Sequence, residues 1–350
     1  MTIDLNKYGY SAFYEMPDGN GTAIPARITA VHKERYEAVC EHGPFHARLK
    51  GSVYYGNEPE SYPTVGDFVL IQYNDSGDSL ITGTLERRTF FSRPDPDPGR
   101  GEQAVAANFD YVFIMQSLNH DFNLRRLERY LTLAWQSGAQ PVVVLTKADL
   151  ADEYAAVLGT AQLHAQGAEV VAVSAKTGLG MDQLKQYLEP GKTIVFLGSS
   201  GVGKSSLVNA LAGEDLMAVN DIREDDSRGR HTTTHRQLIM LDAGVMIIDT
   251  PGMRALGMGD ISVGLDEAFA DVEAYFDQCR FSDCRHETEP GCAIRIAMEN
   301  GGLSAERWQS YLKLQKEARY DDNKTAALRV KHQRNKALSK EIKRMNKTTY

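Results

Sequence analysis

Hydrophobic and polar positions follow two different patterns along the chain. In the first quarter, short apolar runs without a helical period are separated by glycine turns. These runs cover residues 26–31, 36–40, 46–49, 65–71 and 79–81. Several short strands in succession are typical of a small closed β-barrel, which we expect over residues 23–90.

A second pattern starts near residue 105, where apolar runs alternate with segments of helical spacing. The runs cover residues 111–115, 141–145, 169–173, 193–197 and 245–248, and the helical segments cover 123–136, 151–166, 180–188 and 205–211. This alternation predicts an α/β domain over residues 105–268 with a doubly wound, mostly parallel sheet. Ligands of such sheets bind at the carboxyl ends of the strands.

The segments that fit neither pattern predict the domain boundaries. Prolines alternate with other residues from Ser92 to Gly101, which is typical of a stiff linker, and we place this linker at residues 91–104. Residues 1–22 are expected to be flexible. Residues 269–350 contain helical segments at 304–319 and 325–345 and form a C-terminal domain. The fold class is therefore α/β multidomain.

The segment after the 193–197 run has the composition of a phosphate-binding loop. Glycines let successive backbone N–H groups turn toward a polyphosphate, the lysine can reach the terminal phosphates, and the first serine after it can bind Mg²⁺. A chance glycine-rich turn is the alternative, but a strand precedes this segment and a helix follows it. The nucleotide residues are Gly198, Ser199, Ser200, Gly201, Val202, Gly203, Lys204, Ser205 and Ser206, with Ser205 as the Mg²⁺ ligand.

Two motifs upstream of this loop indicate guanine rather than adenine. Thr146, Lys147 and Asp149 follow a buried run and form a Thr-Lys-x-Asp motif. The aspartate can accept from both N–H donors of guanine, and the lysine stem can lie on the base. A second run ends at Ser174, Ala175 and Lys176, whose backbone N–H groups suit the guanine carbonyl. Each motif alone is weak, since an ordinary turn at a strand end would also explain it.

The remaining elements of a GTPase lie downstream of the phosphate loop. Asp249 and Gly252 belong to an Asp-x-x-Gly element, which holds Mg²⁺ through water and senses the terminal phosphate. A polar segment from Gly229 to Thr234 suits a switch loop with a Mg²⁺-binding threonine. All five elements are present, but the guanine motifs come first. This order is a circular permutation, which a compact domain tolerates because its termini lie at the surface.

The composition of the chain also predicts its cellular compartment and a metal site. No apolar run approaches the roughly 20 residues that span a bilayer, and the first residues lack the pattern of a signal peptide, so we expect a cytoplasmic protein. Four cysteines in that compartment favour metal ligation over disulfides. Three of them cluster with a histidine as a tetrahedral zinc set, although free thiols beside a surface histidine are the alternative. The set is Cys279, Cys284, His286 and Cys292, while Cys40 is expected to be a buried small side chain.

The net charge of −8 is divided unevenly along the chain. Residues 323–350 contain nine Lys or Arg and one acid, a charge of +8, so the rest of the chain carries −16. A basic arm on an acidic body is typical of a nucleic-acid contact, although a solvated terminal helix is the alternative.

In its permuted motif order, its Gly-Arg-His-Thr-Thr-Thr segment and its cysteine/histidine cluster, the chain resembles the bacterial family of ribosome small-subunit-dependent GTPase A, also called RsgA or YjeQ. The likeness covers nearly the whole chain. The family has Asn where this chain has Thr146, which keeps a hydrogen-bonding side chain.

This resemblance implies a GTPase that acts late in assembly of the small ribosomal subunit, is stimulated by that subunit and binds its RNA. It implies an oligonucleotide-binding-type barrel, one structural zinc ion per chain, Mg²⁺ with GTP, and a monomer. Met253 stands where many GTPases have a water-positioning glutamine. The family suggests His231 in that role, although this histidine can instead contact RNA or shape the loop. Thr233 is our choice for Mg²⁺, with Thr232 and Thr234 as alternatives.

Two rival functions remain open at this point. One rival is a phosphate-loop ATPase or kinase, in which Asp149 and the Ser174–Lys176 segment would have no base-recognition role. Competition between ATP and GTP for binding would identify such an enzyme. A non-hydrolysing RNA-binding scaffold is the other rival. On the barrel, Tyr54, Tyr55 and Phe68 can either stack on RNA bases or pack within the protein.

Overall fold

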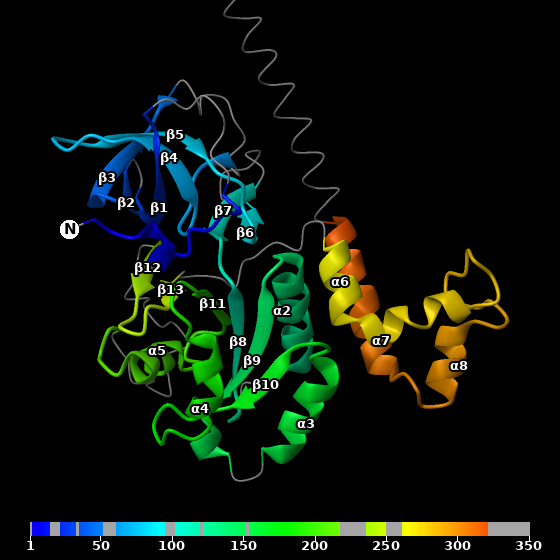
Figure 1. Ribbon diagram of the computed structural model, residues 1–350. Helices are drawn as coiled ribbons and strands as arrows, with labels where there is room; N and C mark the ends of the chain where they lie inside the picture. Colours follow the sequence, from blue (N-terminus) through cyan, green and yellow to red (C-terminus); the bar gives the residue numbers. More distant parts are fainter. Residues whose placement is uncertain are drawn as a thin grey trace, which may run out of the picture.

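The computed structural model describes residues 2–14, 22–32, 35–51, 61–94, 102–119, 122–151, 154–217, 236–249 and 261–320. A β-barrel, a central α/β region and a helical C-terminal region follow one another along the chain (Figure 1).

The barrel has five strands and is closed. In chain order they are β1 (Ile24–Val31), β2 (Tyr36–Cys40), β3 (Gly43–Leu49), β4 (Phe68–Gln72) and β5 (Ser79–Thr84). They pair in the order β1-β2-β3-β5-β4, and pairing of β1 with β4 closes the ring. Small and branched side chains such as Ala26, Ile28 and Ile81 fill the interior, and Cys40 is fully buried there. The predicted barrel is confirmed.

The N-terminal segment packs on the outside of this barrel. A 3₁₀ helix, η1 (Leu5–Tyr8), starts at Asp4, whose side chain accepts from the Asn6 N–H. The Tyr14 ring lies 4.3 Å from the Phe68 ring, centroid to centroid, and both side chains are buried. The expectation of a flexible N-terminus is therefore wrong for residues 2–14, because apolar side chains cover an apolar outer face. Phe68 packs within the protein, whereas Tyr54 and Tyr55 lie outside the described residues.

The α/β region is built on a mostly parallel sheet, as predicted. Five strands run parallel, and β12 (Arg236–Met240) joins antiparallel to the last of them. The sheet order is β10-β9-β8-β11-β13-β12. The parallel strands are β8 (Tyr111–Ser117), β9 (Gln140–Thr146), β10 (Glu169–Ala172), β11 (Thr193–Gly198) and β13 (Met246–Asp249).

Helices cover both faces of this sheet because successive strand residues point to opposite sides. Val112 and Ile114 pack toward one face, and Phe113 and Met115 toward the other. The first face holds α2 (Leu124–Gln136), α3 (Ala155–His164) and α6 (Ser262–Ala268). The second holds α4 (Met181–Leu184), the 3₁₀ turn η4 (Lys185–Tyr187) and α5 (Lys204–Ala212). The doubly wound arrangement is confirmed.

The predicted linker has regular structure at both ends. β6 (Phe90–Pro94) pairs antiparallel with β7 (Glu102–Ala107) in a separate two-stranded sheet. Residues 95–101 lie outside the described residues. The described parts of this segment form no strand of the central sheet, in agreement with the proline pattern. The pattern did not predict the antiparallel pairing of β6 with β7.

Barrel and α/β sheet are joined into one sheet of 11 strands. The joint is made by β1 and β12, where Ala30 pairs with Gln237 and Val31 with Arg236. This continuity across the predicted domain boundary was not expected from the sequence.

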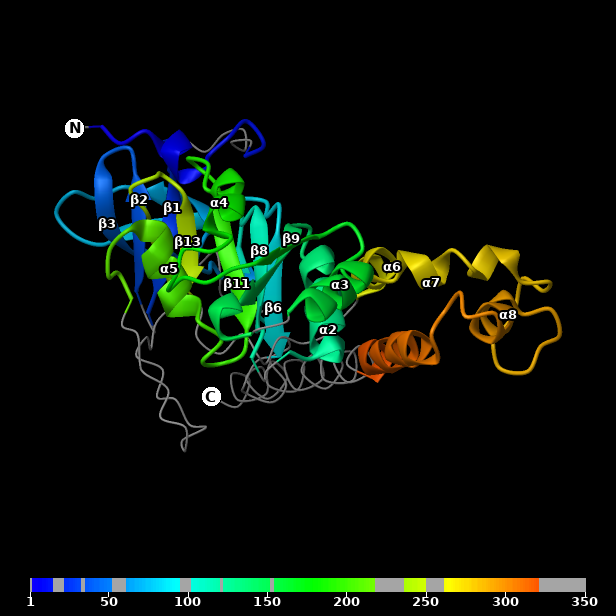
Figure 2. The ribbon, with the colours of Figure 1, turned by 90° about the horizontal axis from the view of Figure 1, so that it is seen from below.

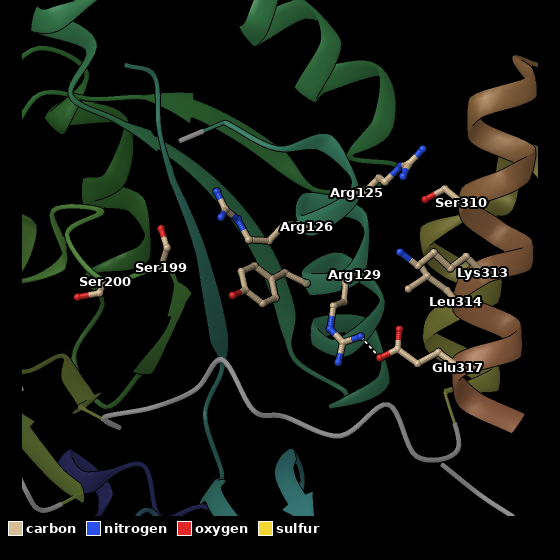
Figure 3. A pocket seen from close by; sticks show the side chains of 10 residues that line it. Arg125, Arg126, Arg129, Ser199, Ser200, Ser310, Lys313, Leu314 and Glu317 are labelled. Carbon is tan, nitrogen blue, oxygen red and sulfur yellow. Dashed lines mark hydrogen bonds and ion pairs between the residues drawn. The ribbon is translucent and has the colours of Figure 1, made fainter. Parts of the chain in front are cut away.

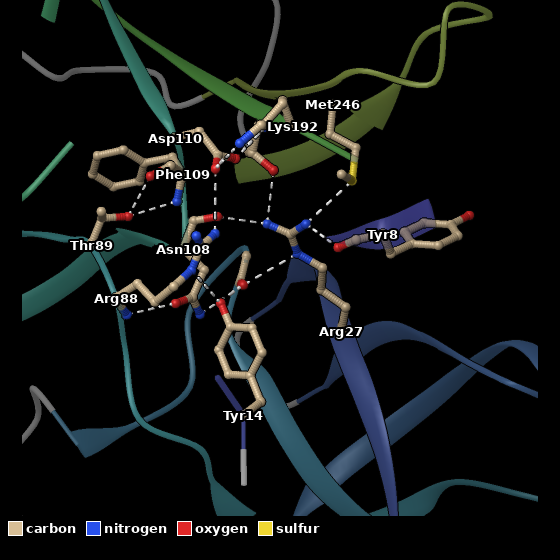
Figure 4. Close-up of polar contacts among 12 residues, drawn as sticks. Tyr8, Tyr14, Arg27, Arg88, Thr89, Asn108, Phe109, Asp110, Lys192 and Met246 are labelled. Carbon is tan, nitrogen blue, oxygen red and sulfur yellow. Dashed lines mark hydrogen bonds and ion pairs between the residues drawn. The ribbon is translucent and has the colours of Figure 1, made fainter. Parts of the chain in front are cut away.

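A buried arginine reinforces the same junction (Figure 4). Arg27 on β1 is 1% exposed, and its guanidinium donates to the carbonyl oxygens of Gly66 at 3.3 Å and Asn108 at 2.9 Å. It also donates to the Thr193 hydroxyl at 3.0 Å and to the Tyr8 carbonyl. Desolvation lowers the pKa of Arg27 to about 10. The barrel, the α/β sheet and the N-terminal segment therefore share one cation.

The C-terminal region extends from the α2 side of the molecule (Figure 2). Its described elements are α7 (Ala270–Glu273), η6 (Phe276–Gln278), α8 (Ala293–Glu299) and a helix over residues 305–320. Arg307 on that helix is 3% exposed and pairs with Glu128 on α2 at 2.8 Å and with Asp271 on α7 at 2.7 Å. The predicted helix at 325–345 lies outside the described residues. None of the described helices has the length and apolarity that crossing a membrane requires.

Candidate nucleotide site and metal cluster

The nucleotide motifs gather at one edge of the sheet. Register pairs Ser117 with Thr146, Leu145 with Ala172, and Met115 with Gly198, so the carboxyl ends of β8, β9, β10 and β11 are level. Asp249 ends the neighbouring β13. Parallel strands of doubly wound sheets bind ligands at this edge. The sheet thus brings together motifs that lie up to a hundred residues apart in the sequence.

The phosphate loop takes its shape from glycines at three positions. Gly201 and Gly203 have φ angles of 74° and 100°, which disfavour any other residue. At Gly198 a Cβ atom would lie 3.0 Å from the Met115 carbonyl and 3.2 Å from Val202. Among the described residues, the amides of Gly201 and Gly203 donate no hydrogen bond. These N–H groups are therefore available to an anion beside the first turn of α5.

Thr146 links the guanine motif to the phosphate loop. Its hydroxyl donates to the Val202 carbonyl at 2.5 Å, and Thr146 itself is 4% exposed. The sequence predicted a hydrogen-bonding side chain here, but not its partner 56 residues away. A shift of the strand end would consequently move the phosphate loop.

The base-recognition residues follow two neighbouring strand ends. Lys147 has a left-handed φ of 59°, and Asp149 lies exposed in the 3₁₀ turn η3 (Ala148–Leu150). The Ala148 N–H donates to the Val173 carbonyl at 3.1 Å, which ties this turn to the end of β10. Ser174 is buried and its hydroxyl accepts from the Thr177 N–H at 3.2 Å. Ala175 and Lys176 follow in the same turn.

Lys204 and Asp249 form an ion pair at the phosphate side of this edge. Asp249 is 2% exposed, and its other carboxylate oxygen, Oδ2, is buried without a hydrogen-bond partner among the described residues. A buried carboxylate oxygen without a donor fits a hydrated cation nearby. Ser205, the predicted Mg²⁺ ligand, follows Lys204 on α5. The oxygen atoms of Ser205 and Asp249 therefore fit Mg²⁺, which would supply positive charge against the phosphates together with Lys204.

Several predicted residues lie outside the described residues. They are His231, Thr232, Thr233, Thr234, Gly252 and Met253.

The predicted metal ligands converge in the C-terminal region. Each of Cys279, Cys284, His286 and Cys292 offers a ligand atom, and these atoms all lie within 4.8 Å of one another. The His286 Nδ1 atom is 3.5 Å from the sulfur of Cys279 and 3.5 Å from that of Cys292. A tetrahedral zinc ion with ordinary bond lengths would separate sulfur and nitrogen ligands by about 3.6 Å. The geometry fits a metal ion of this kind.

The Cys284 thiol is affected by desolvation and by the two neighbouring thiols. Desolvation, with the neighbouring Cys292 and Cys279 sulfurs, raises the pKa of the Cys284 thiol to about 11. A bound cation reverses this effect, because coordination deprotonates the thiol outright.

The sequence did not reveal Glu289 as a support of this loop. Its carboxylate accepts from the N–H groups of Arg285 at 3.1 Å, Glu287 at 2.9 Å and Thr288 at 3.0 Å. Backbone donors, first its own N–H and that of Arg285, hold the pKa of Glu289 at about 2. An acidic residue three positions after a ligand histidine was the available signal.

Comparisons with known proteins show which family this chain resembles. A model of the RsgA GTPase family matches residues 84–259. The small ribosomal subunit biogenesis GTPase RsgA 1 of Listeria innocua is 45% identical over 346 residues, which cover 98% of each chain. A protein of the corresponding name from Methanosarcina acetivorans is 39% identical over 94% of this chain and 89% of its own.

Solved structures show the same fold. YjeQ from Thermotoga maritima aligns with a TM-score of 0.63 and 29% identity, covering 85% of this chain and 98% of its own. YloQ, described as a circularly permuted GTPase, aligns with a TM-score of 0.60 and 25% identity. The alignment covers 87% of this chain and 98% of the YloQ chain. The predicted fold class and the permuted order are confirmed. This chain belongs to the RsgA GTPase family and is a circularly permuted GTP hydrolase.

Proposed function

We propose that the chain hydrolyses GTP as a late assembly factor of the small ribosomal subunit, that the subunit stimulates hydrolysis, and that the chain binds ribosomal RNA. One observation carries the nucleotide part: the guanine motif and the phosphate loop share an edge and are tied by the Thr146–Val202 hydrogen bond. The subunit part rests on relatives named for small-subunit biogenesis that align over nearly the whole chain.

In this proposal, different residues bind the base, bind the phosphates and Mg²⁺, and act on the attacking water. Asp149 and Lys147 hold the base, and the 174–176 turn presents N–H groups to its carbonyl. Loop N–H groups and Lys204 stabilise charge on the phosphates. Ser205, Thr233 and, through water, Asp249 are the residues that would hold Mg²⁺. His231 accepts a proton from the attacking water, because Met253 cannot orient it.

The metal cluster has a structural role in this proposal. Cys279, Cys284, His286 and Cys292 hold one zinc ion, and four protein ligands leave no position for substrate. The cluster lies in the C-terminal region, away from the nucleotide edge (Figure 1). We also propose that the protein works as a monomer in the cytoplasm.

The decisive experiment compares GTP turnover with and without purified small ribosomal subunits, with large subunits as the control. Small subunits alone should raise the turnover number. Equal turnover in all three mixtures would contradict the assembly role while leaving GTP hydrolysis intact. Competition by ATP should be weak, because adenine offers Asp149 no pair of donors.

A further inference from the structure

A cavity of about 530 Å³ lies between α2 and helix 305–320 and reaches the phosphate loop at Ser199 and Ser200 (Figure 3). We call it the α2 groove. Its described lining contains one carboxylate, Glu317, and four cations from both helices: Arg125, Arg126, Arg129 and Lys313. This concentration of positive charge contrasts with the charge of −16 carried by residues 1–322.

The fold, rather than a run of basic residues, brings these cations together. Arg129 pairs with Glu317 across the groove. In addition, Glu128 on α2 pairs with Arg307 at 2.8 Å and accepts from the Ser310 hydroxyl. Both Glu128 and Arg307 are almost fully buried, so the two helices are fixed against each other. Fixed walls keep the cations at set positions, unlike a solvated charge run.

Two of the four cations lack a counter-charge in the described part of the chain. Arg125 and Lys313 are exposed, and neither forms an ion pair with a described residue. Guanidinium groups bind phosphate oxygens through paired N–H donors, and lysine binds them as a point charge. The groove therefore suits a partner that carries phosphates.

The apolar side chains of the lining argue against a protein partner. Tyr130 and Leu314 are each only about 5% exposed, so the groove offers charge but little apolar surface. Protein interfaces are apolar at their centre and depleted of charge, whereas contacts to a nucleic-acid backbone are cationic and polar. Helix 305–320 also leads along the chain into residues 323–350, with their nine cations.

We propose that the α2 groove binds backbone phosphates of small-subunit ribosomal RNA, beside the phosphate loop. The proposal rests on the proposed function and names the surface that contacts the partner. An RNA strand in the groove touches α2, the C-terminal helix and the loop residues Ser199 and Ser200 together. Occupancy of the groove is thereby coupled to the position of the loop that holds GTP.

The test is a salt series with an Arg125→Ala/Lys313→Ala double variant. The matched control, Lys185→Ala/Arg295→Ala, also removes two cations at the surface, the exposed Lys185 and the half-buried Arg295, which pair with Asp182 and Glu299. Binding is measured to purified small subunits and to deproteinised small-subunit RNA. The groove variant should bind both about tenfold more weakly at 0.1 M salt. Its slope of log affinity against log salt should fall by about 1.4–1.8, since each lost phosphate contact removes about 0.7–0.9.

For a third variant we expect a change in RNA affinity in the opposite direction. Glu317→Gln removes the one carboxylate among the described lining residues and should tighten RNA binding. All variants should keep the basal GTP turnover of the parent, which verifies their folding.

Each outcome decides between the alternatives. A groove variant with the parent's salt slope on RNA overturns the proposal. Weaker binding to subunits together with unchanged binding to RNA also overturns it, because the partner would then be a ribosomal protein. If the parent fails to bind subunits but binds RNA, the assembly role fails and the RNA measurements alone decide the groove. No binding by the parent to either partner overturns both.

Discussion

Asp149 is the residue on which base selection depends. It is exposed in the η3 turn that follows β9, where a carboxylate can accept from two guanine donors. We predict that Asp149→Asn weakens GTP binding by about 1.5–3 kcal/mol, the typical loss for hydrogen bonds to a charged group. The amide should in turn favour xanthosine triphosphate, whose carbonyl replaces the amine.

Competition between GTP and xanthosine triphosphate measures this change in selectivity. Asp242→Asn is the matched control, since that exposed aspartate lies in the turn between β12 and β13. An Asp149→Asn protein with the parent's selectivity would remove this residue from the base site.

At this scale the sequence placed the phosphate-loop segment between a strand and a helix, where the structure has β11 and α5. Gly198 to Ser206 form one contiguous segment, so their composition alone identifies the loop. The hydrogen bond from Thr146 to Val202 could not be predicted, because it depends on the register of β9, β8 and β11.

Among the elements, the cysteine/histidine loop brings four candidate metal ligands together within residues 279–292. We predict that Cys284→Ala lowers the bound zinc well below one ion per chain. A structural site contributes its binding free energy to folding, so residues 279–292 should also become sensitive to protease. Zinc analysis and limited proteolysis test this, with Cys40→Ala as the control because Cys40 is buried in the barrel. Full zinc retention in Cys284→Ala would contradict the ligand set.

The buried Glu128 is one of the residues that attach helix 305–320 to α2. Desolvation opposes its charge, but hydrogen bonds from His164, Ser310 and Arg307 prevail and lower the pKa of Glu128. A carboxyl group with a lower pKa in the folded state stabilises the fold above its unfolded pKa of about 4.3. This contribution is lost as the pH falls below that value.

We predict that Glu128→Gln reduces the free energy of unfolding at pH 7 by about 3–5 kcal/mol, the usual loss when one partner of a buried pair is removed. Between pH 5 and pH 3 its stability should fall less steeply than that of the parent. Urea denaturation across this pH range measures both effects. Parallel pH profiles would show that Glu128 is not the group that titrates.

The sequence predicted α2 from its apolar spacing but not the role of its polar face. Glu128 resembles a solvated helix residue, yet it is 2% exposed because a helix 179 residues further along the chain covers it. The sequence also did not indicate that Arg125, Arg126 and Arg129 on the same helix line a groove, because that groove forms only where helix 305–320 packs beside them. Local patterns identify a helix and its apolar face, but they do not identify the element that packs on its other side.

For the whole molecule, Arg27 connects parts that the sequence assigned to different domains. We predict that Arg27→Met destabilises the chain by about 2–5 kcal/mol, since the carbonyls of Gly66 and Asn108 would be buried without this donor. Chemical denaturation checks the value, and Arg295→Met, at a half-buried arginine on α8, is the control. A loss below 1 kcal/mol would show that water replaces the guanidinium.

The sequence predicted the barrel and the α/β sheet, each from its own periodicity. It did not predict their union, because the β12 segment gave no signal of its own and its pairing with β1 joins residues about two hundred positions apart. Such pairing depends on how the two regions pack, which no local pattern records.

The β1–β12 pairing also restricts how this protein can be divided. Cutting the chain between barrel and α/β region would give each piece a new sheet edge, with the unpaired backbone groups of Ala30 and Val31 on one side and of Arg236 and Gln237 on the other. Unprotected edges recruit strands from other molecules and lead to aggregation. The barrel is therefore not a detachable module, because separating it from the α/β region would expose both of these edges.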